Sequence, residues 1–120
     1  MTLVHTLSER LSALLAPPPS PAIYALAGAE GALLDKLRDV IDPEVGLDIV
    51  SMGLIRSVTF RDAVAVVQMT FTTEGCPAAF DLYEDVKEAI VSVGFTPQVE
   101  VVFDPPWSPE HIAPEARAGL

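Results

Sequence analysis

The chain has 120 residues, a length that suits one domain with its own core and excludes two domains of ordinary size. Its formal net charge of −10 leaves no basic cluster that could neutralise phosphates, so nucleic acid and anionic membranes are excluded as favoured partners. A single cysteine cannot form a disulfide within the chain, and no apolar run approaches the roughly 20 residues of a membrane helix. We therefore expect a cytoplasmic protein.

The N-terminal segment, residues 1–16, carries leucines three and four positions apart, which predicts a short amphipathic helix. Residues 17–21 are rich in proline and predict an extended linker, because proline cannot continue a helix. The helix either docks on its own domain or binds a partner. Residues 22–120 are predicted to form the domain, including an extended C-terminal tail.

The next helix is predicted to begin at Ala22 or Glu30 and to end at Ile41, because Asp42 precedes Pro43 and is pushed out of helical conformation. Its predicted inward face contains Leu33, Leu34, Leu37, Val40 and Ile41.

Three carboxylates follow this helix within a few residues. Asp42 and Glu44 flank the bend at Pro43, and Asp48 lies close behind. Such groups can bind a hard cation, but they can equally cap backbone N–H groups, and their spacing matches no calcium loop. The sequence leaves both interpretations open.

Two strands, residues 55–60 and 63–71, are predicted to pair as an antiparallel hairpin through Arg61-Asp62-Ala63. No glycine is present in this turn, so its type is open. Alternation along the second strand predicts one apolar face and one partly polar face. The apolar face contains Ala65, Val67, Met69 and Phe71.

A second helix is predicted over residues 78–93 with Gly94 as its C-cap, followed by a third strand over 98–103. The resulting order, α-β-β-α-β, indicates an α+β fold in which helices cover one face of a small mixed three-stranded sheet. We expect Trp107 to anchor its own tail, and a short helix to begin near Pro114.

Cys76 lies at the predicted junction between the second strand and the second helix. Pro77 suits the first helical position, and Gly75 permits a close backbone approach. Cys76 would then lie near the N-cap, where the helix dipole favours the thiolate that binds metals. The neighbouring acidic side chains oppose this, and a lone cysteine can also pack as a small hydrophobic residue. These neighbours are Glu74, Asp81, Glu84 and Asp85.

Other chemistries find less support in the sequence. No glycine-rich phosphate loop is present, and His5 and His111 lie at opposite ends of the chain, which disfavours a Cys–His pair. Iron–sulfur clusters are usually held by four thiolates, and this chain offers one. A homodimer could supply a second, with the remainder coming from a small thiol, a carboxylate or a client protein. Transient handling of a cluster fits better than storage.

Four motifs occur in order along the chain and together resemble the SufT- and PaaD-like family, also called the MIP-eighteen family and formerly domain of unknown function fifty-nine. The resemblance covers about residues 30–118 and implies an α+β domain of the iron–sulfur cluster assembly type. Family members are implicated in maturing iron–sulfur proteins or assembling oxygenase complexes, as carriers or adaptors rather than enzymes. The motifs are Asp42-Pro43-Glu44, Ile49-Val50-Ser51-Met52-Gly53-Leu54-Ile55, Thr70-Phe71-Thr72-Thr73-Glu74-Gly75-Cys76-Pro77 and Asp104-Pro105-Pro106-Trp107-Ser108-Pro109.

The resemblance places the reactive, metal-binding position on Cys76 and the acidic turn on Asp42 and Glu44. Thr72 and Thr73 match the threonines that precede the cysteine, and their hydroxyls could bond a sulfur atom or cap the strand end. The implied cargo is a transient iron–sulfur cluster or iron, with none permanently bound. The implied partners are the iron–sulfur assembly machinery and client apoproteins.

Two hypotheses about function follow. In the first, the protein is an iron–sulfur maturation factor in which Cys76 transiently binds iron or a cluster, supported by Asp42, Glu44 and Thr73. In the second, it is a metal-free adaptor that docks assembly machinery or client oxygenase enzymes, and Cys76 is only packed. A redox-sensing thiol is a third option, which no feature of the sequence singles out. The sequence lacks the hairpin glycine frequent in the family and the cysteine-rich C-terminal extension of its PaaD branch.

Overall fold

The computed structural model describes residues 21–117, and the side chains of residues 28–117. The predictions for residues 1–20 lie outside this part of the chain. None of the described helices combines the length and apolar character needed to cross a membrane. The elements are α2 (Pro21–Leu37), β1 (Ile55–Arg61), β2 (Val64–Met69), α3 (Ala79–Ser92), β3 (Thr96–Val101), the 3-10 helix η1 (Pro109–His111) and α4 (Pro114–Arg117).

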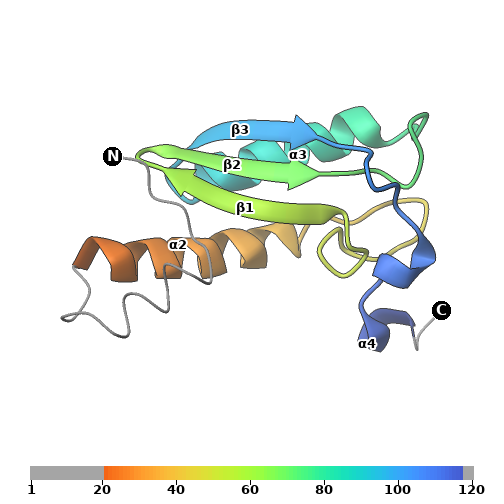
Figure 1. Cartoon of the computed structure of the whole chain (residues 1–120), viewed down its shortest axis with the longest axis horizontal. Coiled ribbons are helices and arrows are strands. Elements are labelled where there is room, and N and C mark those ends of the chain that lie inside the picture. The colour runs from red at the N-terminus through yellow and green to blue at the C-terminus, as the bar shows by residue number, and fades with distance from the viewer. Residues whose placement is uncertain (1–20, 118–120) are drawn as a thin grey trace.

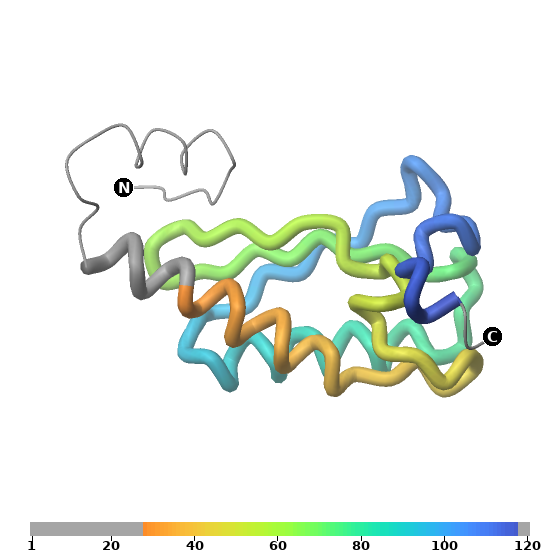
Figure 2. The backbone as a smooth tube through the Cα atoms, turned by 90° about the horizontal axis from the view of Figure 1, so that it is seen from below, coloured from red at the N-terminus to blue at the C-terminus, as the bar shows by residue number. Residues whose placement is uncertain are grey.

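The three strands form one mixed sheet in the order β1-β2-β3 (Figure 1). β2 pairs antiparallel with β1 through the hairpin and parallel with β3, which is reached through the crossover helix α3. Figure 2 shows that α2 and α3 lie together on one side of the sheet. The predicted α+β fold, with helices on one face of a mixed three-stranded sheet, is confirmed.

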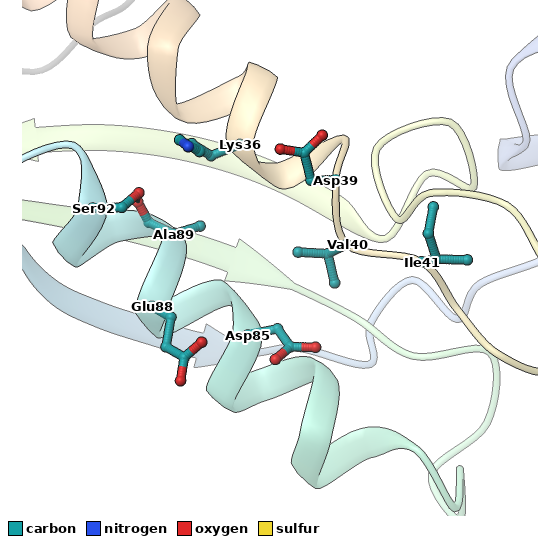
Figure 3. Close-up of a pocket in the computed structure, with 8 residues that line it drawn as sticks. All are labelled: Lys36, Asp39, Val40, Ile41, Asp85, Glu88, Ala89 and Ser92. Atoms are coloured by element: carbon teal, nitrogen blue, oxygen red, sulfur yellow. Dashed lines mark hydrogen bonds between the residues drawn. The ribbon is translucent and has the colours of Figure 1, made fainter.

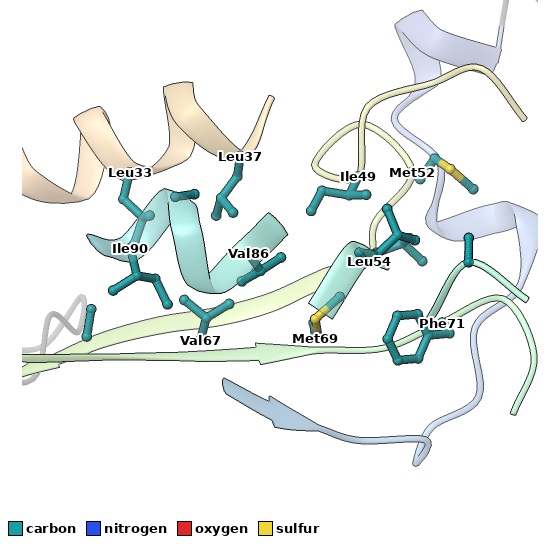
Figure 4. Close-up of a cluster of buried hydrophobic side chains, with 14 of the residues drawn as sticks. Leu33, Leu37, Ile49, Met52, Leu54, Val67, Met69, Phe71, Val86 and Ile90 are labelled. Carbon is teal, nitrogen blue, oxygen red and sulfur yellow. The ribbon is translucent and has the colours of Figure 1, made fainter. Parts of the chain in front are cut away.

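The core lies between the two helices and the sheet (Figure 4). Val67 and Met69 of β2 point into it and are fully buried, as the alternation in the sequence predicts. The apolar stripe of α3 faces them, because residues four apart share one side of a helix. The buried members of this stripe are Leu82, Val86, Ala89 and Ile90, and α2 contributes Leu33 and Leu37.

The opposite face of the sheet carries a ladder of polar side chains. The Ser57 hydroxyl donates to Gln68 Oε1 at 3.1 Å, and Gln68 Nε2 donates to Glu100 Oε1 at 3.2 Å. These three residues are paired across β1, β2 and β3 by the strand register. The ladder confirms that this face is partly polar.

The first helix ends four residues earlier than predicted, at Leu37 rather than Ile41. The backbone after it pairs with a later segment instead: Ile49 N–H donates to the Val40 carbonyl at 2.9 Å, and Asp42 N–H donates to the Leu47 carbonyl at 2.9 Å. These bonds satisfy groups that a longer helix would have used. The prediction that Ile41 faces inward is therefore wrong, since its side chain is 50% exposed.

The turn before β2 and the turn before β3 place different residue types at positive φ. In the hairpin, Asp62 adopts a positive φ of 53°, and so takes the role that glycine has in many such turns. After α3, Gly94 has φ 92°, its N–H donates to the Val91 carbonyl, and Phe95 N–H donates to the Ile90 carbonyl. This pattern is a Schellman motif in which Gly94 follows the C-cap residue Val93, so the C-cap lies one residue earlier than predicted. The strands differ slightly from prediction: β2 ends at Met69, and β3 begins at Thr96.

The C-terminal tail docks on the loop that precedes β1. Trp107 Nε1 donates to the Met52 carbonyl at 2.7 Å, and Ala113 N–H donates to the Ser51 carbonyl at 2.7 Å. Gly53, with φ 77°, lies directly against His111, and a Cβ atom there would stand 2.4 Å from the His111 carbonyl oxygen. Trp107 therefore anchors its own tail, as predicted. We call residues 107–113 the docked tail and residues 51–54 its docking loop.

Candidate functional site

Three segments that are distant in the sequence gather at one end of the sheet. They are the acidic turn (residues 42–48), the cysteine loop (residues 70–78) and the docked tail (Figures 1 and 2). The cysteine loop follows the C-terminal end of β2, and the tail follows the C-terminal end of β3. Because β2 and β3 are parallel, both strands deliver their following segments to the same end. This arrangement brings the predicted site residues into one region.

Cys76 lies in two consecutive turns that precede α3. Its N–H donates to the Thr73 carbonyl at 3.3 Å, and its carbonyl accepts the N–H of Ala79 at 3.1 Å. The N-cap of α3 is Ala78, so Pro77 precedes the helix and Cys76 is two residues before the cap. The prediction of Pro77 at the first helical position is therefore wrong. The thiol lies outside the first turn, to which the influence of the helix dipole is largely confined.

The Cys76 side chain packs against the hydrophobic core and is 8% exposed. Its neighbours Gly75 and Pro77 are both exposed. A Cβ atom on Gly75 would meet nothing within 4 Å, and its φ is outside the left-handed region. Contrary to expectation, Gly75 is thus not required by a close backbone approach within the chain. The space around a Cβ on Gly75 is open, in the residue that directly precedes Cys76.

The acidic turn is held together by its own carboxylates. Asp42 is 1% exposed, and its Oδ1 accepts the N–H of Glu44 at 2.9 Å. Its carbonyl accepts the N–H of Gly46 at 2.7 Å. Asp48 Oδ2 accepts the N–H of Ser51 at 2.9 Å. This bond fixes the start of residues 51–54, on which the tail docks. Asp42 and Asp48 therefore cap backbone groups, whereas Glu44 is exposed to solvent.

The two threonines of the cysteine loop contribute through their backbone. Thr73 is exposed, Thr72 is half-buried, and within residues 28–117 neither hydroxyl forms a hydrogen bond. The carbonyl of Thr73 fixes the loop by accepting the N–H of Cys76. The Thr73 hydroxyl is accessible to a molecule that approaches the loop from solvent.

The donor set in this region is incomplete for a stable metal site. Among the residues with described side chains, no three of the His, Cys, Asp and Glu type are placed to hold a metal ion. His111 is engaged in the tail, where its Nδ1 accepts the N–H of Ser108 at 3.1 Å. The structure brings the acidic turn and the cysteine loop to one end of the molecule, but Cys76 is the only thiol of the chain.

One residue near the thiol was not singled out by the sequence. Phe80, in the first turn of α3, is 71% exposed. The signal was present, because Phe80 does not share the helical spacing of the buried residues Leu82, Val86 and Ile90. Aromatic residues are enriched at surfaces that bind other proteins.

Comparisons with known proteins give a consistent family. Residues 30–102 match a family model described as iron–sulfur cluster assembly protein. The chain is 34% identical over 91 residues to the Fe-S protein maturation auxiliary factor YitW of Bacillus subtilis, covering 73% of this chain and 89% of that protein.

A second relative is the Fe-S protein maturation auxiliary factor SufT of Staphylococcus aureus, 37% identical over 84 residues. The match covers 68% of this chain and 96% of that protein. Among solved structures, the domain of unknown function DUF59 from Bacillus anthracis is similar, with a TM-score of 0.71 and 39% identity over 78% of this chain and 92% of that chain.

Proposed function

The chain belongs to the family of iron–sulfur cluster assembly proteins, and from this premise we propose that it matures iron–sulfur proteins by carrying iron or a cluster on Cys76. The observation that carries the proposal is the placement of the only thiol in a loop flanked by exposed residues. We assign the protein the role of a carrier rather than an enzyme. We place it in the cytoplasm, because a lone thiol that binds iron requires a reducing compartment.

A single thiol favours transfer over storage. On binding iron, the Cys76 thiol releases its proton to solvent and the thiolate becomes the ligand. Clusters are usually held by four thiolates, so the remaining ligands come from a second copy, a small thiol, the assembly machinery or a client apoprotein. Cargo held by so few ligands of this chain passes readily to an apoprotein that offers a full set.

The surrounding residues take different roles in this proposal. Glu44 belongs to the acidic turn and Thr73 to the cysteine loop, both residues are exposed, and we assign them contacts with the cargo. Asp42 is occupied by the backbone of its own turn, so we assign it the positioning of Glu44. The open space beside Gly75 gives the cargo or its donor a route to the thiol.

The proposal is tested by anaerobic reconstitution with ferrous iron and sulfide in the presence of glutathione, which can supply the missing thiolates. We expect the native chain to retain iron and visible absorption after desalting and to pass iron to an apo-ferredoxin. Cys76→Ser should lose both properties. Pro77→Ala is the matched control, because it changes an exposed residue of the same loop and leaves the thiol in place. Unfolding midpoints confirm that each variant is folded.

Two observations favour a second candidate, the metal-free adaptor. Cys76 belongs to the hydrophobic cluster, and Phe80 is 71% exposed at the start of the helix that follows. If Cys76→Ser transfers iron as well as the native chain, or if neither retains any, carriage through Cys76 is rejected. The adaptor function is then favoured. It predicts that Phe80→Ser weakens binding to client enzymes in binding assays.

A further inference from the structure

A groove of about 400 Å³ lies between α3 and the end of α2 with the segment that follows it (Figure 3). Its walls combine aliphatic and charged side chains. Ile41, which is 50% exposed, lines it together with the half-buried Val40 and the buried Ala89. The charged lining residues are Lys36, Asp39, Asp85 and Glu88.

The groove carries an excess of negative charge that the described part of the chain does not neutralise. The lining contains three carboxylates and one ammonium group, and none of these four side chains forms an ion pair with another residue of the described part. Two nearby cations are engaged elsewhere: Arg38 pairs with Asp35 at 3.1 Å, and Lys87 lies 3.9 Å from Glu84. An incoming cationic group would therefore meet unpaired carboxylates beside an apolar surface.

We propose that this groove docks a lysine- or arginine-rich amphipathic segment of a partner protein. Charge complementarity selects this occupant, because basic side chains would pair with Asp39, Asp85 and Glu88 while an aliphatic side chain covers Ile41. The inference concerns a partner of the protein and does not require that Cys76 binds iron.

Two other occupants fit the charges less well. A second copy of the chain, with its own net charge of −10, would bring acidic surface against acidic surface. The first 20 residues of this chain contain one arginine and one glutamate, so they offer no net cationic charge. A basic partner is the occupant whose charge the groove complements.

The groove is also close to the cysteine loop along the chain. Asp85 follows the first residue of α3 by six positions, about 9 Å along the helix axis at the usual rise per residue. A segment bound beside α3 would hold its parent protein near Cys76. Docking would then use α3, and delivery of a cargo would use the loop that directly precedes this helix.

The test follows backbone amide signals of the full, isotope-labelled chain by NMR while a synthetic peptide is added. The peptide contains lysine and leucine arranged as an amphipathic helix, and a glutamate–leucine peptide of the same pattern is its control. At low salt we expect saturable shifts confined to residues 36–41 and 85–92, with binding weakened at higher salt. The glutamate peptide should produce none.

Matched charge variants distinguish peptide binding at the groove from general electrostatic attraction to the acidic protein. Asp85→Asn combined with Glu88→Gln should weaken peptide binding about fivefold, because two ion pairs of the exposed kind are lost. Glu110→Gln combined with Glu115→Gln removes the same charge from exposed tail positions and should change binding by less than about 1.5-fold. Cys76→Ser should bind normally, whether or not the thiol carries iron.

Several results would overturn the proposal. These are an absence of saturable binding at low salt, shifts spread over the whole acidic surface, or equal losses in the two double variants. Concentration-dependent shifts at the groove without peptide would assign it to a second copy instead. Ile41→Ser should weaken peptide binding without changing the formal charge, and unchanged binding in this variant would contradict the apolar part of the site.

Discussion

Gly53 and Gly75 lie in loops at the same end of the sheet, yet their surroundings are opposite. At Gly53 the docked tail fills the space, and an added Cβ would stand 2.4 Å from the His111 carbonyl oxygen. At Gly75 an added Cβ would meet nothing within 4 Å, although the neighbouring Cys76 is buried. One glycine is required by the fold of the chain itself. The other, Gly75, has open space around it and is not required by packing within the described part of the chain.

This difference leads us to expect that two family motifs of the chain serve different ends: stability for the docked tail, and the proposed cargo handling for the cysteine loop. The docked tail donates the Trp107 indole N–H and the Ala113 backbone N–H to carbonyls of its docking loop. The cysteine loop leaves Thr73, Gly75 and Pro77 exposed around a single thiol. We therefore expect mutations in the packed tail to lower stability, and mutations of exposed residues in the cysteine loop to lower function without a comparable loss of stability.

The largest expected effect is at Gly53. Gly53→Ala should lower the free energy of unfolding by about 3 kcal/mol, because a residue with a side chain must adopt positive φ and also press on the His111 backbone. Gly46→Ala is the matched control, since Gly46 also has positive φ, of 81°, but has nothing within 4 Å, and it should cost about 1 kcal/mol. Urea unfolding measures both values. Equal losses would show that the tail can move away without cost.

A smaller effect is expected when only the hydrogen bond of the tail is removed. Trp107→Phe keeps an aromatic ring but leaves the Met52 carbonyl without its indole donor, which should cost about 1 kcal/mol. Thermal or urea unfolding gives the value. The rate of amide hydrogen exchange at Ala113 should rise in the same variant. The Ala113 N–H donates a hydrogen bond to the Ser51 carbonyl, and this bond belongs to the same contact between the tail and residues 51–54. Unchanged exchange would mean that the tail docks without Trp107.

The smallest stability effect is expected at Gly75. Gly75→Ala should leave the free energy of unfolding unchanged or raise it by about 0.5 kcal/mol, because the native backbone accepts alanine and the unfolded chain loses freedom. Gly75→Val should nevertheless reduce iron transfer by narrowing the approach to Cys76. Unfolding curves and the apo-ferredoxin assay, run on the same samples, give the two readouts. A destabilised Gly75→Ala, or full transfer by a folded Gly75→Val, contradicts the functional interpretation of this loop.

The periodicity of apolar residues in the sequence was sufficient to predict the helix and the strand that pack against each other in the core. The stripe of α3 and the alternation of β2 were predictable because burial imposes a regular spacing on apolar residues. The end of α2 was not, since it depends on backbone bonds from Val40 and Asp42 to residues that lie further along the chain. Local signals describe a segment, and pairing with a distant segment can override them.

The candidate site shows the same division. The acidic turn and the cysteine loop could be named from their motifs, but the sequence did not show that Asp42 and Asp48 are used as backbone caps. It also indicated a close backbone approach at Gly75, where the structure has open space, because a glycine that a tight turn needs and a glycine in open surroundings look identical in a sequence. Only the space around the residue distinguishes them.

The parallel pairing of β3 has a consequence for the free edge of the sheet. Thr96 N–H and Val102 N–H both point to β2, where they bond the carbonyls of Ala63 and Met69. Backbone groups alternate along a strand, so Pro97 directs its nitrogen outward, to the edge that another strand could join. Proline has no N–H to donate there. The exposed strand thus begins with a gap in its hydrogen-bonding row, a natural protection against edge-to-edge aggregation.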